Sequence, residues 1–198
     1  MRKIISITQV SLDGVMQAPG GPEEDPSNSF THGGWAMPFM DDDAPPVIDE
    51  LISRKFDMLL GRRTYDIFAG YWPHQSDNPI GEAFNKATKY VVTRGTDELQ
   101  WKGSERIGGD VVKEIRRLKA SEGPELHVWG SSELLQTLIA ADLIDEYRLW
   151  VFPVVLGSGK RLFEKGLPPR RLTLVESGKR SSGVLINTYH PAGPLPKE

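Results

Sequence analysis

Apolar residues along the chain recur with two spacings, one typical of β-strands and the other of α-helices. Short apolar runs that stop at turn residues predict strands. These strands are expected at 3–12, 58–60, 89–93, 126–129, 145–156, 172–175 and 184–190. Apolar residues spaced three and four apart predict helices. These helices are expected at 43–55, 64–68, 110–118 and 131–139.

The order of these elements predicts the fold class. Strand and helix alternate through the first three-quarters of the chain, and then strands alone follow. This order is typical of an α/β protein whose mostly parallel sheet has helices on both faces and ends in an antiparallel hairpin. The 198 residues have room for one domain, expected at 1–190, with a frayed tail at 191–198. Pro153 indicates that strand 145–156 bends or lies near a sheet edge.

A long segment at 15–43 separates the first strand from the first helix. It is rich in Gly, Pro, Ser, Asn and acidic residues, but it also holds Phe30, Trp35 and Phe39. Because loops of this length inside a domain are more often functional than accidental, we expect it to pack over a site.

Composition narrows the function classes. The formal net charge of −3 gives no electrostatic reason to expect nucleic acid or an anionic membrane as a partner. The chain has no cysteine, which excludes disulfides and thiolate zinc sites, and its four histidines show no metal-ligand spacing. No stretch approaches a membrane span or a secretory signal, so a cytoplasmic protein is expected.

The end of the second strand carries the sharpest chemical signal. The strand stops at Gly61, and a helix then opens with free backbone N–H groups beside Arg62, Arg63 and Thr64. A helix N-terminus with adjacent guanidinium groups is suited to phosphate. The alternative is that Gly61 only turns the chain and both arginines are solvated.

Two other strand ends carry weaker signals. Gly130 precedes Ser131 and Ser132, whose hydroxyls could cap the next helix or bind a pyrophosphate oxygen. Thr93 and Arg94 place a hydroxyl and a cation at the end of another strand, where a plain surface arginine is the alternative. In α/β sheets such strand ends gather at the edge where ligands bind.

In combination, these segments resemble dihydrofolate reductase and the reductase half of the bifunctional riboflavin-biosynthesis deaminase–reductase. The resemblance runs in order from about residue 3 to residue 190. The matching segments are Ser11-Leu12-Asp13-Gly14, Leu60-Gly61-Arg62-Arg63-Thr64-Tyr65, Val91-Val92-Thr93, the Gly130 turn, Asp145-Glu146-Tyr147 and Pro153-Val154-Val155-Leu156-Gly157-Ser158-Gly159.

The resemblance implies a dihydrofolate-reductase-like three-layer fold with NADPH lying across the carboxyl edge of the sheet. The residues it places at the cofactor are Gly14, Gly61, Arg62, Arg63, Thr64, Thr93, Arg94, Gly130, Ser131, Ser132 and Leu134. Arg63 and Arg94 would pair with the 2′-phosphate and so select NADPH over NADH. The resemblance also implies a homodimer paired through strand 147–155, although a buried central strand would have the same pattern.

The substrate side is less defined by the resemblance. Asp13 and Asp41 are the candidate catalytic acids, the alternatives being an Asp-Gly turn and a run of acids before a helix. The residues expected beside the substrate are Trp35, Trp129, Leu156 and Gly157. Neither the zinc deaminase half nor the acid usual before the glycine pair is present, which counts against the riboflavin substrate.

The sequence therefore predicts an NADPH-dependent reductase of a pterin- or pyrimidine-like heterocycle. Two alternatives stay open: a non-catalytic nucleotide-binding protein of the same fold, and a nucleotide-binding transferase.

Overall fold

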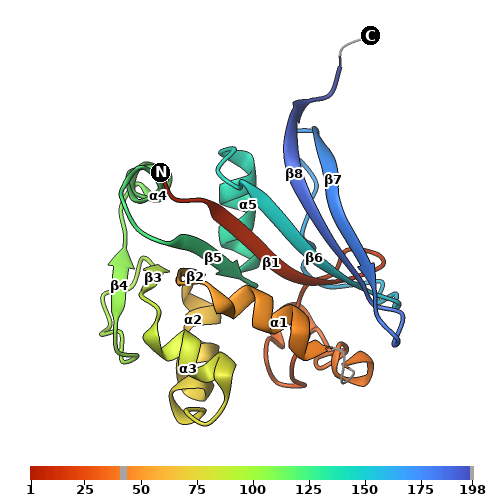
Figure 1. Cartoon of the computed structure of the whole chain (residues 1–198), viewed down its shortest axis with the longest axis horizontal. Coiled ribbons are helices and arrows are strands. Elements are labelled where there is room, and N and C mark those ends of the chain that lie inside the picture. Colours follow the sequence, from red (N-terminus) through yellow and green to blue (C-terminus); the bar gives the residue numbers. More distant parts are fainter. Residues whose placement is uncertain (41–43, 197–198) are drawn as a thin grey trace.

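The computed structural model describes residues 1–40 and 44–196 and is built on one eight-stranded sheet (Figure 1). The strands are β1 (Ile4–Ser11), β2 (Phe56–Gly61), β3 (Lys89–Val92), β4 (Ser104–Ile107), β5 (Glu125–Trp129), β6 (Glu146–Phe152), β7 (Arg170–Lys179) and β8 (Leu185–Pro194). Their order is β4-β3-β2-β5-β1-β6-β8-β7. Strands β1 to β6 run parallel, whereas β8 is antiparallel to both β6 and β7. The predicted mixed sheet with a C-terminal antiparallel hairpin is confirmed.

Helices cover both faces of this sheet because its inner strands are apolar on both sides. The helices are α1 (Ala44–Ser53), α2 (Arg62–Tyr71), α3 (Pro79–Lys86), α4 (Val111–Ala120) and α5 (Ser132–Ala140). Leu126 and Val128 of β5 pack with residues of α4 and α5, while Trp129 packs on the opposite face with Phe84 of α3. Side chains that alternate along a strand therefore build two separate cores.

One α-helix and one strand of the described residues were not predicted from the sequence. Helix α3 begins where the Asn78 side chain accepts a hydrogen bond from the Ile80 amide at 2.8 Å. The edge strand β4 has the sequence Ser-Glu-Arg-Ile, and its central residues are exposed. A strand with so few buried side chains lacks the alternating apolar pattern from which strands are predicted.

The prediction for strand 145–156 was wrong in extent and position. Strand β6 ends at Phe152, because Pro153 has no N–H to donate to a neighbouring strand. It also lies between β1 and β8, so neither of its edges is free to pair with a second copy. The alternative interpretation, a buried central strand, is the correct one.

The predicted frayed tail was also wrong in part. Strand β8 continues to Pro194, and its register with β7 pairs Leu172 with Pro191 and Arg170 with Pro194. These two strands form a long hairpin at one side of the molecule (Figure 1). The carboxyl ends of β3, β2, β5 and β1, in contrast, meet at a single edge, and that edge holds the predicted site.

Candidate functional site

The Gly61 and Gly130 turns lie side by side and are joined by hydrogen bonds. The Gly61 amide donates to the Ser131 hydroxyl at 3.0 Å, and the Ser131 amide donates to the Thr64 hydroxyl at 3.1 Å. The Ser131 hydroxyl in turn donates to the Trp129 carbonyl at 3.1 Å. Two turns that are about 70 residues apart in sequence therefore form one structural unit, as the parallel pairing of β2 and β5 requires.

The backbone at the second turn is left-handed at two successive residues. Gly130 has φ of 55° and Ser131 has φ of 59°. Glycine adopts this conformation freely, whereas serine does so at a cost on the order of 1 kcal/mol. The bonds of the Ser131 side chain to Gly61 and Trp129 offset that cost. Its hydroxyl makes no capping bond to α5, so the prediction of Ser131 as a capping side chain was wrong.

Helices α2 and α5 begin at this edge without a side-chain cap, whereas α3 and α4 are capped. Helices α2 and α5 start at Gly61 and Ser131 with no capping hydrogen bond. Asn78 caps α3, and Asp110 caps α4 by accepting from the Lys113 amide at 3.1 Å, as predicted for Asp110. Uncapped helix N-termini leave backbone N–H groups and positive dipole ends open to an anion. The edge therefore fits a phosphorylated ligand.

The two arginines of α2 point in different directions. Arg62 pairs with Asp66 at 2.8 Å and lies 3.9 Å from Asp97, in the loop that follows Thr93 and Arg94. Arg63 turns the other way and pairs with Asp25 of the long loop at 2.5 Å. The sequence analysis placed Arg63 and Arg94 together at the 2′-phosphate. In the structure it is Arg62, not Arg63, that lies beside the loop after β3 that carries Arg94.

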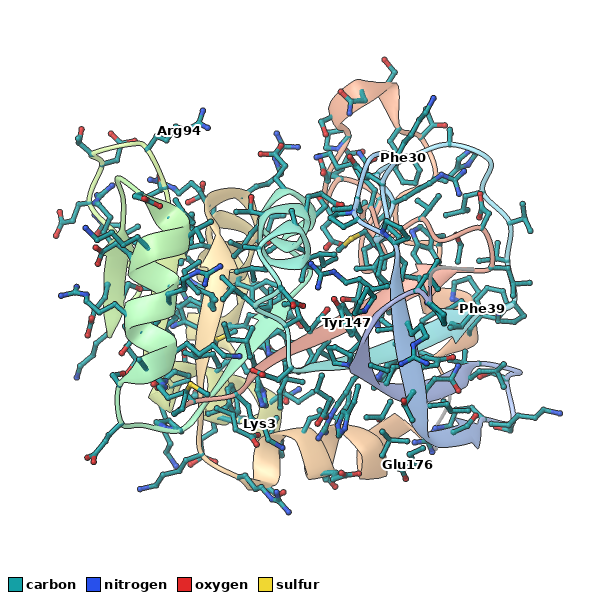
Figure 2. The ribbon with its side chains drawn as sticks, turned by 90° about the horizontal axis from the view of Figure 1, so that it is seen from above. Lys3, Phe30, Phe39, Arg94, Tyr147 and Glu176 are labelled. Atoms are coloured by element: carbon teal, nitrogen blue, oxygen red, sulfur yellow. The ribbon has the colours of Figure 1, made fainter. Side chains whose placement is uncertain are left out.

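The remaining cofactor candidates divide between the edge and the core. Arg94 is exposed and projects outward from the loop after β3, far from Phe30 in the long loop (Figure 2). Thr93 is buried, and its hydroxyl accepts from the Gly95 amide at 3.0 Å. Leu134 is buried in the core, whereas Ser132 is half-buried at the start of α5.

Asp13 connects the end of β1 to the segment that follows β6. Its carboxylate accepts from the Ser11 hydroxyl at 2.6 Å and from the amides of Leu156 and Gly157 at 3.1 and 2.9 Å. The Ser11 bond and the two amide bonds lower the pKa of Asp13 to about 2. Arg161 also donates to the carbonyl of Asp13. Asp13 is thus ionised at neutral pH and serves as an anchor, while Gly14 follows it with φ of 81° and open space beside it.

The aromatic candidates on the substrate side differ in accessibility. Trp35 is buried, donates to the Gln17 carbonyl at 2.8 Å and packs edge-on against Phe152, so it is a core residue here. Trp129 is half-buried, and its indole N–H has no hydrogen-bond partner among the described residues. Asp41 lies outside the described residues.

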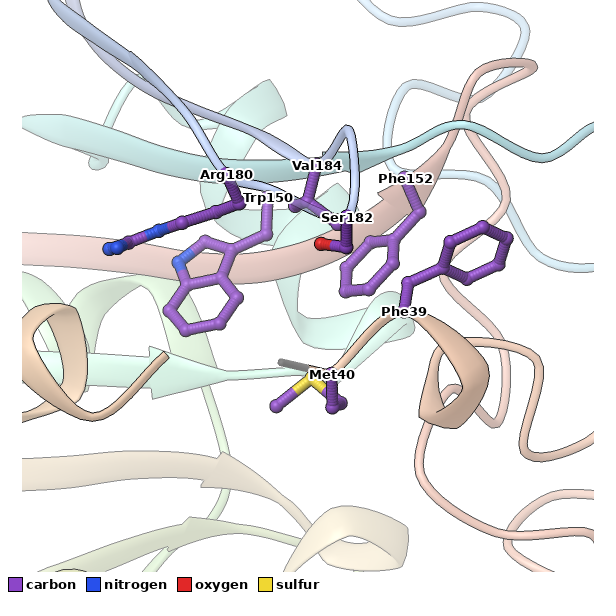
Figure 3. Close-up of a pocket in the computed structure, with 7 residues that line it drawn as sticks. All are labelled: Phe39, Met40, Trp150, Phe152, Arg180, Ser182 and Val184. Carbon is purple, nitrogen blue, oxygen red and sulfur yellow. The ribbon is translucent and has the colours of Figure 1, made fainter. Parts of the chain in front are cut away.

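A small pocket opens near Trp150 on the same face of the sheet as Trp129. Figure 3 shows the rings of Phe39 and Phe152 side by side, with Trp150 opposite Phe39 and with Met40 below them. Within the part of the chain that the structure describes, the indole N–H of Trp150 has no hydrogen-bond partner. The residues that line the pocket are Phe39, Met40, Trp150, Phe152, Arg180, Ser182 and Val184.

Sequence reasoning missed the residues that fasten the long loop. Asp25 bridges Arg63 and Lys160, and Gln17 accepts a hydrogen bond from the Lys160 amide at 3.0 Å. In the sequence, Asp25 follows two other acids, Glu23 and Glu24, and nothing in the pattern sets it apart. Its partners come from distant segments, which only the fold brings together.

Two negative findings concern the described part of the chain. Residues 1–40 and 44–196 hold no group of three or more His, Asp or Glu side chains placed to bind a metal ion. Within the same residues, every helix is too short or too polar to cross a membrane.

Comparison with known proteins identifies the family. The model of the RibD C-terminal domain matches residues 2–186. The chain belongs to this family. Its members are reductases with the dihydrofolate-reductase-like fold, and NADPH is the cofactor of the family's reductases.

Two curated relatives of this chain come from Bacillus subtilis (strain 168). The uncharacterized protein YyaP is 28% identical over 197 residues, which cover 96% of this chain and 95% of YyaP. The uncharacterized protein YwjB is 29% identical over 136 residues, which cover 67% of this chain and 71% of YwjB. Neither relative identifies a substrate.

Solved structures agree on the fold. A putative riboflavin biosynthesis protein from Shewanella sp. PV-4 has a TM-score of 0.67 at 22% identity, covering 96% of this chain and 99% of its own. Dihydrofolate reductase from Enterococcus faecalis, solved in complex with NADP(H) and RAB-propyl, has a TM-score of 0.61 at 16% identity, covering 96% of this chain and 96% of its own. A pyrimidine reductase-like protein from Corynebacterium diphtheriae has a TM-score of 0.60 at 13% identity, covering 96% of this chain and 92% of its own.

The anchoring role of Asp13 predicts a pH-dependent loss of stability in Asp13→Asn. The native pKa of about 2 lies below the ordinary value of 3.8, so the ionised carboxylate stabilises the fold above pH 4. Because solvent screens part of the interaction, we expect the variant to lose roughly 1 kcal/mol of unfolding free energy near pH 7 in urea titrations. The difference from wild type should shrink as the pH falls from 4 toward 2.

The matched control is Asp77→Asn, which removes an exposed carboxylate and should change stability little at either pH. An equal loss for Asp13→Asn at pH 7 and at pH 3 would show that its charge is not what stabilises the turn.

Proposed function

We propose that this chain is a cytoplasmic NADPH-dependent reductase that transfers hydride to a heterocyclic small molecule, pterin-like or pyrimidine-like. The observation that carries the proposal is the pair of uncapped helix N-termini joined through Gly61, Thr64 and Ser131. Membership of a reductase family supports the same assignment.

The cofactor phosphates would lie across the joined turns. The open amides at the starts of α2 and α5, with the Arg62 and Arg63 guanidinium groups, supply hydrogen bonds and positive charge to the phosphates. Thr93, Arg94 and the adjacent Arg62 would surround the adenosine and its 2′-phosphate. Gly14 would lie beside the nicotinamide end, where β1 terminates.

When bound, NADPH supplies the hydride, and the protein must hold the acceptor ring against it. Trp129, Leu156 and Gly157 are the residues we place beside that ring. The two amides that bond Asp13 fix the position of Leu156 and Gly157. Because Asp13 is ionised, we assign it this positioning role, and Asp41 stays our candidate for delivering a proton to the atom next to the one reduced.

Selectivity for the 2′-phosphate predicts the effect of Arg94→Ala. An exposed guanidinium that pairs with this group should contribute to NADPH binding and not to NADH binding. We expect wild type to bind NADPH more tightly than NADH, and the variant to lose roughly tenfold or more in NADPH affinity. Fluorescence titration measures both constants. The control Arg117→Ala removes an exposed arginine of α4, and equal binding of both cofactors by wild type would contradict the assignment.

Hydride transfer itself distinguishes the reductase from the two alternatives. We expect loss of the reduced-nicotinamide absorbance when the protein is mixed with NADPH and a responsive member of a panel of pterins, pyrimidines and quinones. The same mixture without the heterocycle is the control. Tight NADPH binding with no turnover across the panel would favour a non-catalytic nucleotide-binding protein, and failure to bind NADPH would favour a transferase of another nucleotide.

We also propose a homodimer, now through β7 in place of β6. Strand β7 is one of the two edge strands of the sheet (Figure 1). Its residues Leu174 and Val175 are 51% and 54% exposed. An exposed apolar edge strand is suited to pairing with another strand. Light scattering should give twice the chain mass for wild type and the single mass for Val175→Lys. Glu105→Lys on the opposite edge strand is the control, and a monomeric wild type would contradict the proposal.

A further inference from the structure

Asp25 binds two cations that come from different segments of the chain. Its Oδ1 atom lies 2.5 Å from Nη1 of Arg63 at the start of α2. Its Oδ2 atom lies 2.7 Å from Nζ of Lys160, in the segment after β6. The Asp25 side chain is only 11% exposed, so this is not a loose surface pair.

The Lys160 side of this arrangement is reinforced by further bonds. The Gln17 side chain donates to the carbonyls of Asp25 and Ser27 at 2.9 Å each, and it accepts from the Lys160 amide. The loop around Asp25 is therefore fixed to the segment after β6 whether or not Arg63 is bound.

The Arg63 side has fewer reinforcements. Nη1 of Arg63 donates to Asp25 and, at 2.7 Å, to the Ser27 hydroxyl. The Arg63 side chain is 55% exposed and stands at the uncapped N-terminus of α2. A guanidinium binds carboxylate and phosphate with the same donor geometry. Asp25 is thus paired with the same Arg63 guanidinium that a phosphate at the N-terminus of α2 would bind.

We propose that Asp25 is an internal competitor for the phosphate-binding guanidinium of Arg63, so that cofactor binding must break the Asp25–Arg63 ion pair. The proposal rests on the proposed function, because it takes the competing anion to be a phosphate of NADPH. Arg63 faces away from Arg94, so the phosphates concerned are the pair that NADPH and NADH share. Only the molecules in which the Asp25–Arg63 ion pair is broken can bind the phosphate through Arg63. The apparent affinity for the cofactor is therefore the intrinsic affinity multiplied by the fraction of molecules in that open state.

The test is cofactor titration of Asp25→Asn, which keeps the shape of the side chain and removes its charge. We expect NADPH and NADH to bind more tightly by about the same factor, roughly threefold to tenfold. Ser27→Ala, which removes the second acceptor of Arg63 and leaves Lys160 untouched, should shift both affinities in the same direction by less. Glu23→Gln is the matched control, because it removes an equal charge from an exposed side chain in the same loop.

A second readout needs no cofactor. Hydrogen exchange of residues 20–29 should rise in Asp25→Asn and not in Glu23→Gln, because one of the loop's attachments to α2 is lost. Equal or weaker binding of both cofactors by Asp25→Asn would overturn the proposal, and so would a gain confined to NADPH or an equal gain in Glu23→Gln. If wild type fails to bind NADPH at all, the proposed function fails instead.

Discussion

The parallel pairing of β2 with β5 is the constraint on which the candidate site depends. Its register sets Met58 beside His127, so both strands end at the same sheet edge and both following helices begin there. Parallel strands require a crossover between them, which is why two turns about 70 residues apart become neighbours. The bonds among Gly61, Thr64 and Ser131 then fix the two helix ends relative to each other. Without this pairing, each turn would be an ordinary uncapped helix start.

The cations at this edge are balanced by acids of the protein itself. Arg62 has Asp66 and Asp97, and Arg63 has Asp25. A chain with a net charge of −3 can therefore keep a local concentration of positive charge without strong repulsion. The same balance means that any anionic ligand exchanges one set of ion pairs for another. The affinity of the site depends on the difference between the two sets, not on the number of arginines.

The sequence was sufficient for what depends on local pattern. Apolar spacing located the inner strands and most helices, and glycine after a strand located both turns. It was insufficient where long-range contacts decide. Strand β4 buries little, the central place of β6 depends on its pairing with β1 and β8, and the direction of Arg63 depends on an acid 38 residues earlier. Asp25 looks no different in the sequence from Glu23, because its partners are defined only by the fold.

Pro153 links the end of β6 to the shape of the site. Since β6 cannot continue, the following segment turns back over the start of the long loop, where the Met16 amide donates to the Lys160 carbonyl at 2.8 Å. The two segments approach so closely that a Cβ at Gly159 would lie 2.6 Å from the Val15 side chain, and the φ of 120° there also favours glycine. Asp13 and Asp25 both bind this segment as carboxylates. Burial raises the pKa of Asp25, but hydrogen bonds from Lys160 and Ser27 outweigh it and lower that pKa to about 2. One proline, one glycine and two ionised acids thus hold the long loop against the segment that follows β6, next to Arg63 at the start of α2.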